Sequence, residues 1–493
     1  MTTTQNTDQA HLTDEQRLQQ VREVVADLGH LVGGRLVPGD GTFTVTAPWL
    51  GAPLAECPSA GMGDLDAAVA AAKAAQPAWA ADEPARVRAL HAIADAIEAN
   101  AELLGTVLAA ETGKPIRIAT GEPMGAAAHV RYHADEVVPT ETLIDDDEQT
   151  VLVVHEPIGV VAAITPWNGP LLMLANKIAA ALRVGNTVVA KPSPYTPLAS
   201  LLFGRIVQDL VPPGVINVLA GGDELGVAMT QHVDVSMVSF TGSIRAGKAI
   251  MQQSADGLRR LQLELGGNDA AVVLPDVDVQ AIAPRIYRGA FALSGQICAA
   301  VKRLYVHESI AEELVEALTA IARTHTPGTP WDPETTMGPS TTRPQFEYVQ
   351  ELVDDAVAAG ATVVTGGSAP DRDGFFLEPT ILTGVDNGIR VVDEEQFGPV
   401  LPVMTFTDID EVLERVNATD YGLGGSVWTR DTALALDLAR RFESGSTWIN
   451  RHPHVGAEVP FGGVKLSGLG REGGPRSYEG FSEPRTISIL KEN

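Results

Sequence analysis

Cysteine is nearly absent from the sequence, which has only Cys57 and Cys298 among its 493 residues. Two cysteines in a chain of this length exclude a disulfide framework. No uninterrupted apolar run approaches the roughly 18 residues that a membrane span needs, and the first thirty residues contain no apolar signal core. These absences predict a cytoplasmic protein that does not span a membrane.

Basic residues are also scarce, with 35 Lys and Arg against 63 Asp and Glu and a formal net charge of −28. Nucleic acids and anionic membranes bind basic surfaces, so the charge argues against both as partners. The length predicts about two or three domains. The polar amino end is expected to be disordered through about Asp14, with a helix over residues 15–28.

The pattern of apolar residues predicts an α/β fold. Ala-rich helical periodicity over about 65–105 gives way, from Val160, to short β-branched runs that alternate with helical stretches. A second alternating series follows Glu264, so we expect two α/β domains with parallel, doubly wound sheets that share a cleft. Residues 150–157 and the carboxyl end have strand character outside both series and are predicted to form a small assembly hairpin.

Cys298 lies in the segment SGQICAAVKR, where Lys302 and Arg303 follow it closely. A thiolate is a nucleophile, and nearby positive charge favours it over the thiol. The alternative is a small buried apolar residue, which is the usual role of a free cysteine. We assign that second role to Cys57, since no ionisable cluster lies beside it.

Asn168 and Glu264 both follow predicted strands, at the edge where open α/β sheets bind ligands. The Asn168 amide in ITPWNGP is able to donate to a developing oxyanion, or alternatively to cap a helix. Glu264 in LELGG is a candidate general base because an apolar setting raises a carboxyl pKa. Its alternative role is an edge-strand carboxylate that faces solvent.

A strand-to-helix turn in FTGSIRAG places Gly242 and Ser243 where backbone amides and a helix dipole bind a pyrophosphate, although glycine there also suits an ordinary turn. Lys191 ends a strand at the same edge, as a ribose or phosphate ligand or simply a solvated lysine. The Gly-x-Gly-x-x-Gly spacing over residues 468–473 is rejected as a dinucleotide motif, because no βαβ unit is able to follow it.

Seven segments, ITPWNGP, AKPSP, FTGS, LELGG, GQIC, EEQFGPV and PFGGVKLSGLGRE, occur in the order and spacing of the aldehyde dehydrogenase superfamily. From about Leu31 to its end, the chain resembles that family. The resemblance implies a Rossmann-like cofactor domain, an α/β catalytic domain and a small β oligomerisation hairpin in a homodimer or homotetramer. It also implies oxidation of an aldehyde to a carboxylic acid with NAD or NADP.

The resemblance assigns a role to each catalytic residue. Cys298 attacks the aldehyde, Asn168 and the Cys298 amide hold the oxyanion, and Glu264 activates water to hydrolyse the thioester, supported by Lys177 and Glu472. One alternative is transfer of the acyl group to coenzyme A, which Glu264 argues against. Another is a non-catalytic binding or structural member, which would not need these groups together.

The resemblance also assigns residues to the two ligands, and none to a metal. The cofactor set is Ile164, Thr165, Pro166, Trp167, Lys191, Ser193, Pro194, Gly242, Ser243, Leu265, Glu395 and Phe397. The substrate set is Gly169, Met173, Asn176, Ile297, Arg451, His452, Val455 and Phe461. Pro194 stands where many NAD-preferring members have Glu, so the resemblance predicts that NADP is tolerated.

Several substrate positions depart from the family pattern. Gly169 and Asn176 stand where several members carry aromatic rings, which implies a wider or more polar funnel. Arg451 and His452 lie in the loop that shapes its mouth and suggest a polar or carboxylated aldehyde, unless these side chains only face solvent.

The sequence divides into an amino-terminal tail over 1–28 and a cofactor domain over 29–133 and 158–264. The catalytic domain is predicted over 265–445. An active-site loop region over 446–472 returns to the cofactor domain, and oligomerisation strands are expected over 134–157 and 473–493.

Overall fold

The computed structural model describes residues 13–491, and its first large sheet has eight strands in the order β19-β11-β10-β7-β8-β9-β1-β2. The five central strands, β11 to β9 in that order, are parallel, and the outer three run antiparallel to their neighbours. The strands are β1 (His30–Val32), β2 (Arg35–Val37), β7 (Val160–Ile164), β8 (Thr187–Lys191), β9 (Ile216–Val218), β10 (Met237–Thr241), β11 (Arg260–Glu264) and β19 (Gly468–Leu469). The chain order reverses between β7 and β10, and such reversals open a crevice at the carboxyl ends of the strands.

Both faces of this sheet are covered by helices. Alternate residues of β7 pack on opposite sides, with Val161 and Ala163 in one core cluster and Val160 and Ala162 in another. This arrangement explains why β7 and β8 are buried throughout and read as continuous apolar runs rather than alternating ones. One face is covered by α3 (Glu83–Ala99), α4 (Ala101–Thr112), α5 (Ile116–Asp135), α6 (Pro170–Val184) and α7 (Leu198–Val207), and the other by α2 (Met62–Ala81), α8 (Asp223–Gln231) and α9 (Ile244–Ser254).

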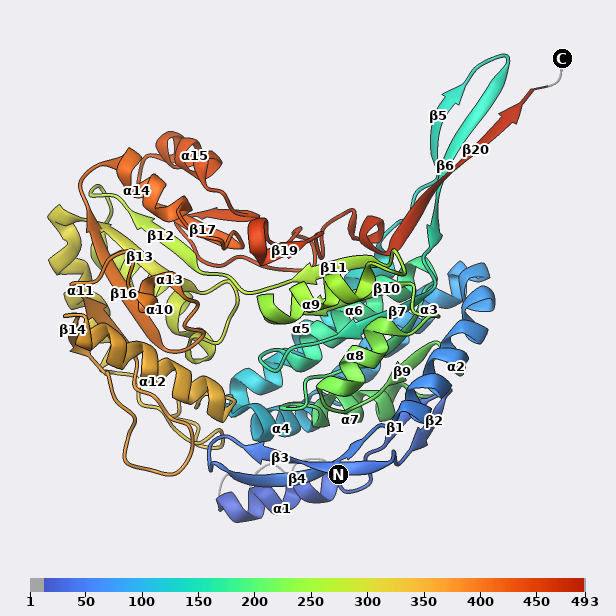
Figure 1. Cartoon of the computed structure of the whole chain (residues 1–493), viewed down its shortest axis with the longest axis horizontal. Helices are drawn as coiled ribbons and strands as arrows, with labels where there is room; N and C mark the ends of the chain where they lie inside the picture. Colours follow the sequence, from blue (N-terminus) through green and yellow to red (C-terminus); the bar gives the residue numbers. More distant parts are fainter. Residues whose placement is uncertain (1–12, 492–493) are drawn as a thin grey trace, which may run out of the picture.

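The second large sheet has seven strands in the order β14-β15-β16-β13-β12-β17-β18, and all are parallel except β14. Its strands are β12 (Asp269–Val273), β13 (Val301–His307), β14 (Thr362–Thr365), β15 (Thr380–Thr383), β16 (Val400–Phe406), β17 (Gly424–Trp428) and β18 (Ser446–Ile449). Its helices are α10 (Val279–Phe291), α11 (Glu308–Ala322), α12 (Arg343–Ala358), α13 (Arg390–Asp393), α14 (Ile409–Asn417) and α15 (Thr432–Arg441). The two large sheets form separate lobes (Figure 1).

A three-stranded antiparallel sheet lies outside both large sheets, as the sequence predicted. It consists of β5 (Glu141–Asp145), β6 (Gln149–Pro157) and β20 (Ser482–Leu490), and it projects from the body as a ribbon (Figure 1). A short 3₁₀ helix, η4 (Ser477–Phe481), leads into β20. A separate hairpin of β3 (Gly41–Ala47) and β4 (Ala52–Ser59) lies beside α1 (Asp14–Val25).

The predicted α/β class and its two alternating series are confirmed. The helix expected over 15–28 is α1, which begins at Asp14 because Thr13 forms a capping box with Gln16. The disorder predicted through about Asp14 is wrong for Thr13 and Asp14, which cap and begin α1, and residues 1–12 lie outside the described part of the chain. The proposed boundary at 445 falls one residue before β18, a strand of the seven-stranded sheet. No helix within residues 13–491 is long and apolar enough to cross a membrane.

Candidate active site

A cleft of about 880 Å³ opens at the carboxyl ends of β7, β8, β10 and β11, where the strand order reverses. Every residue that the sequence assigned to the cofactor lines this cleft: Ile164, Thr165, Pro166, Trp167, Lys191, Ser193, Pro194, Gly242, Ser243, Leu265, Glu395 and Phe397. Cys298, Glu264 and Asn168 line it as well. The cleft thus joins three chemically active side chains to a groove built by the first sheet.

The loop that carries Cys298 has an unusual backbone. Leu293, Ser294 and Gly295 have φ of 51°, 57° and 73°, a left-handed run that costs a non-glycine residue about 1–3 kcal/mol. A Cβ at Gly295 would lie 2.1 Å from the Gly398 carbonyl oxygen, so only glycine fits there. The surrounding structure must therefore hold the loop in place.

Hydrogen bonds to the segment 338–341 supply that support. Ser294 Oγ donates to the Gly338 carbonyl at 2.7 Å, and the Gln296 side chain accepts from the Thr341 amide at 2.8 Å. Gln296 also donates to the Pro339 carbonyl at 3.2 Å. These contacts fix the backbone from which the thiol projects.

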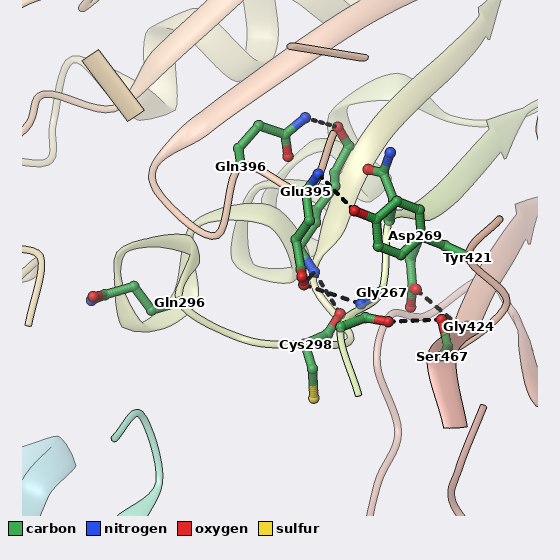
Figure 2. Close-up of polar contacts among 12 residues, drawn as sticks. Gly267, Asp269, Gln296, Cys298, Glu395, Gln396, Tyr421, Gly424 and Ser467 are labelled. Atoms are coloured by element: carbon green, nitrogen blue, oxygen red, sulfur yellow. Dashed lines mark hydrogen bonds and ion pairs between the residues drawn. The ribbon is translucent and has the colours of Figure 1, made fainter. Parts of the chain in front are cut away.

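Cys298 is half-buried, and its thiol projects away from the Glu395 contacts (Figure 2). Burial raises the pKa of this thiol well above its usual value; the Glu264 charge raises it further, and Lys302 only partly opposes them. Lys302 Nζ instead donates to the Cys298 carbonyl at 2.5 Å and pairs with Glu395 at 3.0 Å.

Arg303 is also engaged elsewhere, since its guanidinium donates to the carbonyls of Asn268 and Val416. The expectation that nearby positive charge favours the thiolate is confirmed in direction for Lys302, which lowers the pKa of Cys298, but burial and the Glu264 charge outweigh it. The positive charges of Lys302 and Arg303 hold backbone carbonyls and Glu395, while the burial of the thiol decides its protonation state.

Asn168 contacts the nucleophile loop directly, because its Nδ2 donates to the Gln296 carbonyl at 2.9 Å. The helix cap considered for this side chain is wrong: α6 begins at Pro170, its N-cap is Gly169, and no side chain caps it. An amide nitrogen has two N–H donors, so the second remains for an oxyanion at Cys298.

Glu264 ends β11 and is buried, with an exposed fraction of 4%. The solvent-facing edge strand considered for it is wrong, because β19 pairs with β11 on its outer side. Burial raises the pKa of this carboxyl well above its usual value, and the Glu472 charge adds to the effect. Lys177 opposes the shift and forms a buried ion pair with Glu472.

The groove fits a dinucleotide. A Cβ at Gly242 would lie 2.5 Å from the Phe240 ring, so the turn before α9 carries no side chain at this position. The Gly242 amide donates to the Glu264 carbonyl at 3.0 Å, and the first turn of α9, which follows Ser243, is the part of this segment suited to a phosphate. Lys191 is buried, and its pKa is lowered to about 8 by that burial. Its Nζ donates to the Pro192 carbonyl at 3.3 Å, and an ammonium group has three donors, so others are left for a ribose or phosphate.

The opposite end of the groove is aromatic and carboxylate-lined. Trp167 and Phe397 form an edge-to-face pair with centroids 5.2 Å apart. Glu395 accepts from the Gly267 amide at 3.1 Å. A Cβ at Gly266 would lie 2.1 Å from the Glu395 carboxylate, so a side chain at this position would displace that carboxylate.

The predicted substrate residues do not all lie together. Met173 lines the cleft, whereas Gly169, Ile297 and Phe461 are half-buried outside its lining, and Arg451 and Val455 are exposed. The exposure of Arg451 agrees with the alternative that its side chain only faces solvent.

His452 is wrongly placed at the tunnel mouth by the sequence, since its side chain is fully buried. Its ring packs edge-on against Trp448 with centroids 4.8 Å apart, and it lies 3.6 Å from Asp269. Burial lowers the pKa of His452 to about 3, so its ring is neutral at ordinary pH.

The sequence prediction missed a wall of the cleft that α8 and α9 form. These residues are Asp223, Gly226, Val227, Thr230, Arg245, Ala246, Ala249, Ile250 and Gln253. On α9 they repeat at three and four positions, the spacing of one helix face. That spacing, together with the turn at Ser243, was a signal in the sequence that could have identified them.

Among residues 13–491, no group of three or more His, Cys, Asp or Glu side chains could hold a metal ion.

A sequence model described as the aldehyde dehydrogenase family matches residues 36–487. The chain belongs to the aldehyde dehydrogenase family.

Individual relatives agree with this assignment. An aldehyde dehydrogenase of Enchytraeus buchholzi is 39% identical over 91% of this chain and 92% of its own length. Retinaldehyde dehydrogenase 3 of Mus musculus is 38% identical over 87% and 86%. The NAD+ complex of an aldehyde dehydrogenase from Bacillus cereus has a TM-score of 0.94 and 33% identity, covering 98% of this chain and 99% of that one.

We expect Glu264→Gln to shift the alkylation of Cys298 by iodoacetamide to lower pH. The Glu264 charge raises the pKa of the thiol, so a neutral isostere lets the thiolate form earlier. Intact-mass spectrometry across the neutral and alkaline range measures the rate. Cys57 is fully buried and should not react.

Glu479→Gln, at an exposed carboxylate of η4, is the matched control and should leave the pH dependence of Cys298 alkylation unchanged. Identical profiles for Glu264→Gln and the unaltered protein would contradict the electrostatic coupling between the two groups.

Proposed function

We propose that this protein oxidises an aldehyde to the carboxylic acid with a nicotinamide dinucleotide, through a covalent adduct on Cys298. The observation that carries the proposal is that Cys298, the Asn168 amide and Glu264 line one cleft, which continues into a groove suited to a dinucleotide. In the reaction, the Cys298 sulfur adds to the aldehyde carbon. The free N–H of Asn168 and the Cys298 amide then stabilise the oxyanion, worth roughly 10²–10³ in rate for one donor.

The dinucleotide, when bound, supplies the hydride acceptor of the reaction. Lys191 and the turn at Gly242 and Ser243 would hold its adenosine and pyrophosphate ends, and Glu395 and Phe397 would hold the nicotinamide end. The substrate is left as a thioester on Cys298. Glu264, whose pKa is raised by burial, accepts a proton from the water that hydrolyses this thioester.

A general base that activates water distinguishes this function from acyl transfer to coenzyme A, because that reaction does not use water and would not need Glu264 near Cys298. It also separates it from a binding role without catalysis. The test is a panel of acetaldehyde, hexanal, benzaldehyde and succinic semialdehyde, each with NAD and with NADP, followed by the absorbance of the reduced cofactor. No turnover with any pair would overturn the proposal.

Cys298→Ala is expected to lower turnover by at least about 10⁴-fold, because no other thiol reaches the cleft. Reduced-cofactor absorbance with the best panel aldehyde measures the loss. Cys57→Ala removes the buried second cysteine and should retain activity. Turnover at the normal rate in a folded Cys298→Ala protein would refute the covalent mechanism.

We propose that the protein accepts both NAD and NADP. Pro194 and Ser193 line the cleft near Lys191 without adding a carboxylate, and Arg245 adds a cation to the same cleft. Asp223 also lines the cleft, and its negative charge, which acts on Lys191, opposes the binding of NADP. A preference for NAD above about a thousandfold, roughly 4 kcal/mol, would contradict dual use.

Pro194→Glu is expected to lower kcat/KM for NADP by about tenfold or more relative to NAD, because a carboxylate repels a 2′-phosphate and accepts from a 2′-hydroxyl. Steady-state kinetics with both cofactors measure the ratio. Val233→Glu, which adds the same charge at a position that is 86% exposed outside the cleft lining, is the control. An unchanged ratio in Pro194→Glu would refute this role of position 194.

We propose that the protein is a homodimer or homotetramer that assembles through the sheet of β5, β6 and β20. Ile487 and Ile489 are exposed on the same face of β20, an edge strand with a free row of backbone groups. A projecting sheet of three strands has little core of its own. We also propose a cytoplasmic location, which the two free cysteines support.

Ile487→Asp combined with Ile489→Asp is expected to shift the protein to monomers, because two charges would be buried in the interface. Size-exclusion chromatography with light scattering measures the mass. Val233→Asp places one charge at an exposed loop and should not change it. An unaltered oligomer in the double variant would contradict assembly through this face.

A further inference from the structure

Behind Glu264 lies a buried chain of polar side chains that extends well beyond the two residues expected to support it. Its first members are Lys177 and Glu472, which form an ion pair with 1% and 8% exposed fractions. Lys177 Nζ also donates to Ser239 Oγ at 3.1 Å. One carboxylate oxygen of Glu472, Oε1, is thereby held from the α6 side.

The other oxygen of Glu472 is held by Asn176, the residue before Lys177 on α6. Asn176 Nδ2 donates to Glu472 Oε2 at 3.3 Å. Asn176 Oδ1 lies 3.1 Å from His129 Nδ1 and 3.0 Å from His133 Nε2, two histidines one turn apart on α5. The amide nitrogen must face the carboxylate, so both histidines donate to Oδ1 and the amide cannot turn over.

His133 connects this chain to the carboxyl-terminal segment. Its Nδ1 lies 3.4 Å from Glu136 Oε2, and Ser477 Oγ donates to the same oxygen at 2.7 Å. Burial raises the pKa of Glu136, but the hydrogen bonds from His133 and Ser477 outweigh it and hold that pKa below its usual value. Glu136 therefore stays ionised and fixes the ring of His133.

Glu472 needs such a second anchor because its backbone is in a glycine-rich loop. Gly470, Gly473 and Gly474 all have positive φ, and the Glu472 backbone pairs with Phe461 alone. Lys177 has a long and flexible stem. A single ion pair with such a partner would leave the carboxylate free to rotate.

We infer that Asn176, held by His129 and His133, is a positioning residue that orients the Glu472 carboxylate for proton transfer with Glu264. This inference rests on the proposed function, because it concerns the hydrolysis of the Cys298 thioester. The charged groups that face Glu264 are Glu472, Lys177, Glu395 and Asp269. Of these, only Glu472 and Lys177 belong to the buried series of polar contacts that includes Asn176.

The inference gives Asn176 a role that differs from the substrate contact expected from the sequence. Its side-chain amide is directed to three buried or half-buried partners, and the residue is 7% exposed. Steps that build the acyl adduct should therefore tolerate changes at Asn176 better than the step that removes it.

The test measures those two steps separately, with the panel aldehyde that gives the fastest burst of reduced cofactor. The burst reports formation of the adduct, and acid-quenched intact-mass spectrometry reports loss of the adduct from Cys298. Asn176→Asp keeps the shape but sets a second carboxylate against Glu472. We expect adduct loss about tenfold slower near neutral pH, with its pH limb raised by about one unit, because added negative charge makes Glu264 harder to ionise.

His129→Leu and His129→Gln form a matched pair at a half-buried position that tolerates change better than Asn176. Leucine cannot donate to Asn176 Oδ1 and should slow adduct loss, whereas the glutamine amide can donate and should restore it to within about twofold. His91→Leu, at a half-exposed histidine on α3 that pairs with Asp135, should leave both steps unchanged. Thermal unfolding of each variant checks the fold.

The inference is overturned if adduct loss in Asn176→Asp and His129→Leu is unchanged, or if the burst slows as much as the loss. The inference is also overturned if His129→Gln does not restore the rate of adduct loss and the pH limb does not move, because a purely structural role would predict that pattern. An unaltered protein that shows no burst with any aldehyde would instead refute the proposed function.

Discussion

Two acidic groups, the Cys298 thiol and the Glu264 carboxyl, line one cleft, and the repulsion between their charges links the protonation of one to that of the other. Burial raises the pKa of Cys298 and of Glu264, and the charge of Glu264 raises that of the thiol further. Because Coulomb repulsion is reciprocal, a thiolate also disfavours a charged Glu264. In the proposed reaction a sulfur bound to carbon carries no charge, so this repulsion is absent while the adduct exists.

This arrangement depends on elements from both large sheets. The first sheet brings Glu264 to the end of β11, one residue beyond the apolar part of the strand, and covers it with β19. The second sheet supplies the loop before β13, where Leu293 and Ser294 adopt a conformation that their own backbone disfavours. Contacts to 338–341 stabilise that loop, so the position of the thiol belongs to the tertiary structure.

Much of the fold and of the cleft was predictable from the sequence, for a physical reason. Strands buried on both faces give continuous apolar runs, and residues that follow parallel strands gather at one edge. Ile164, Lys191, Gly242 and Glu264 satisfy this rule, and the structure brings them to the same cleft.

Side-chain direction was not predictable in the same way. The spacing of Lys302 from Cys298 suggested a contact with the thiol, but its ammonium turns to the Cys298 carbonyl and Glu395. His452 follows β18 closely, yet a cis peptide with Pro453 and the Trp448 ring accompany a buried position. Asn176 meets His129 and Glu472 across 47 and 296 residues of sequence, and no local pattern records such contacts.

The carboxyl-terminal segment shows how side-chain contacts hold what the backbone leaves loose. Left-handed glycines follow Glu472, so the chain from there to β20 has little conformational preference of its own. Asn176 and Lys177 hold it at Glu472, and Glu136 holds it at Ser477. Ser482, at the start of β20, contacts His155 of β6 at 3.1 Å. The carboxylate behind Glu264 and strand β20 of the projecting sheet are therefore joined by one short segment, whose position is set by buried polar contacts.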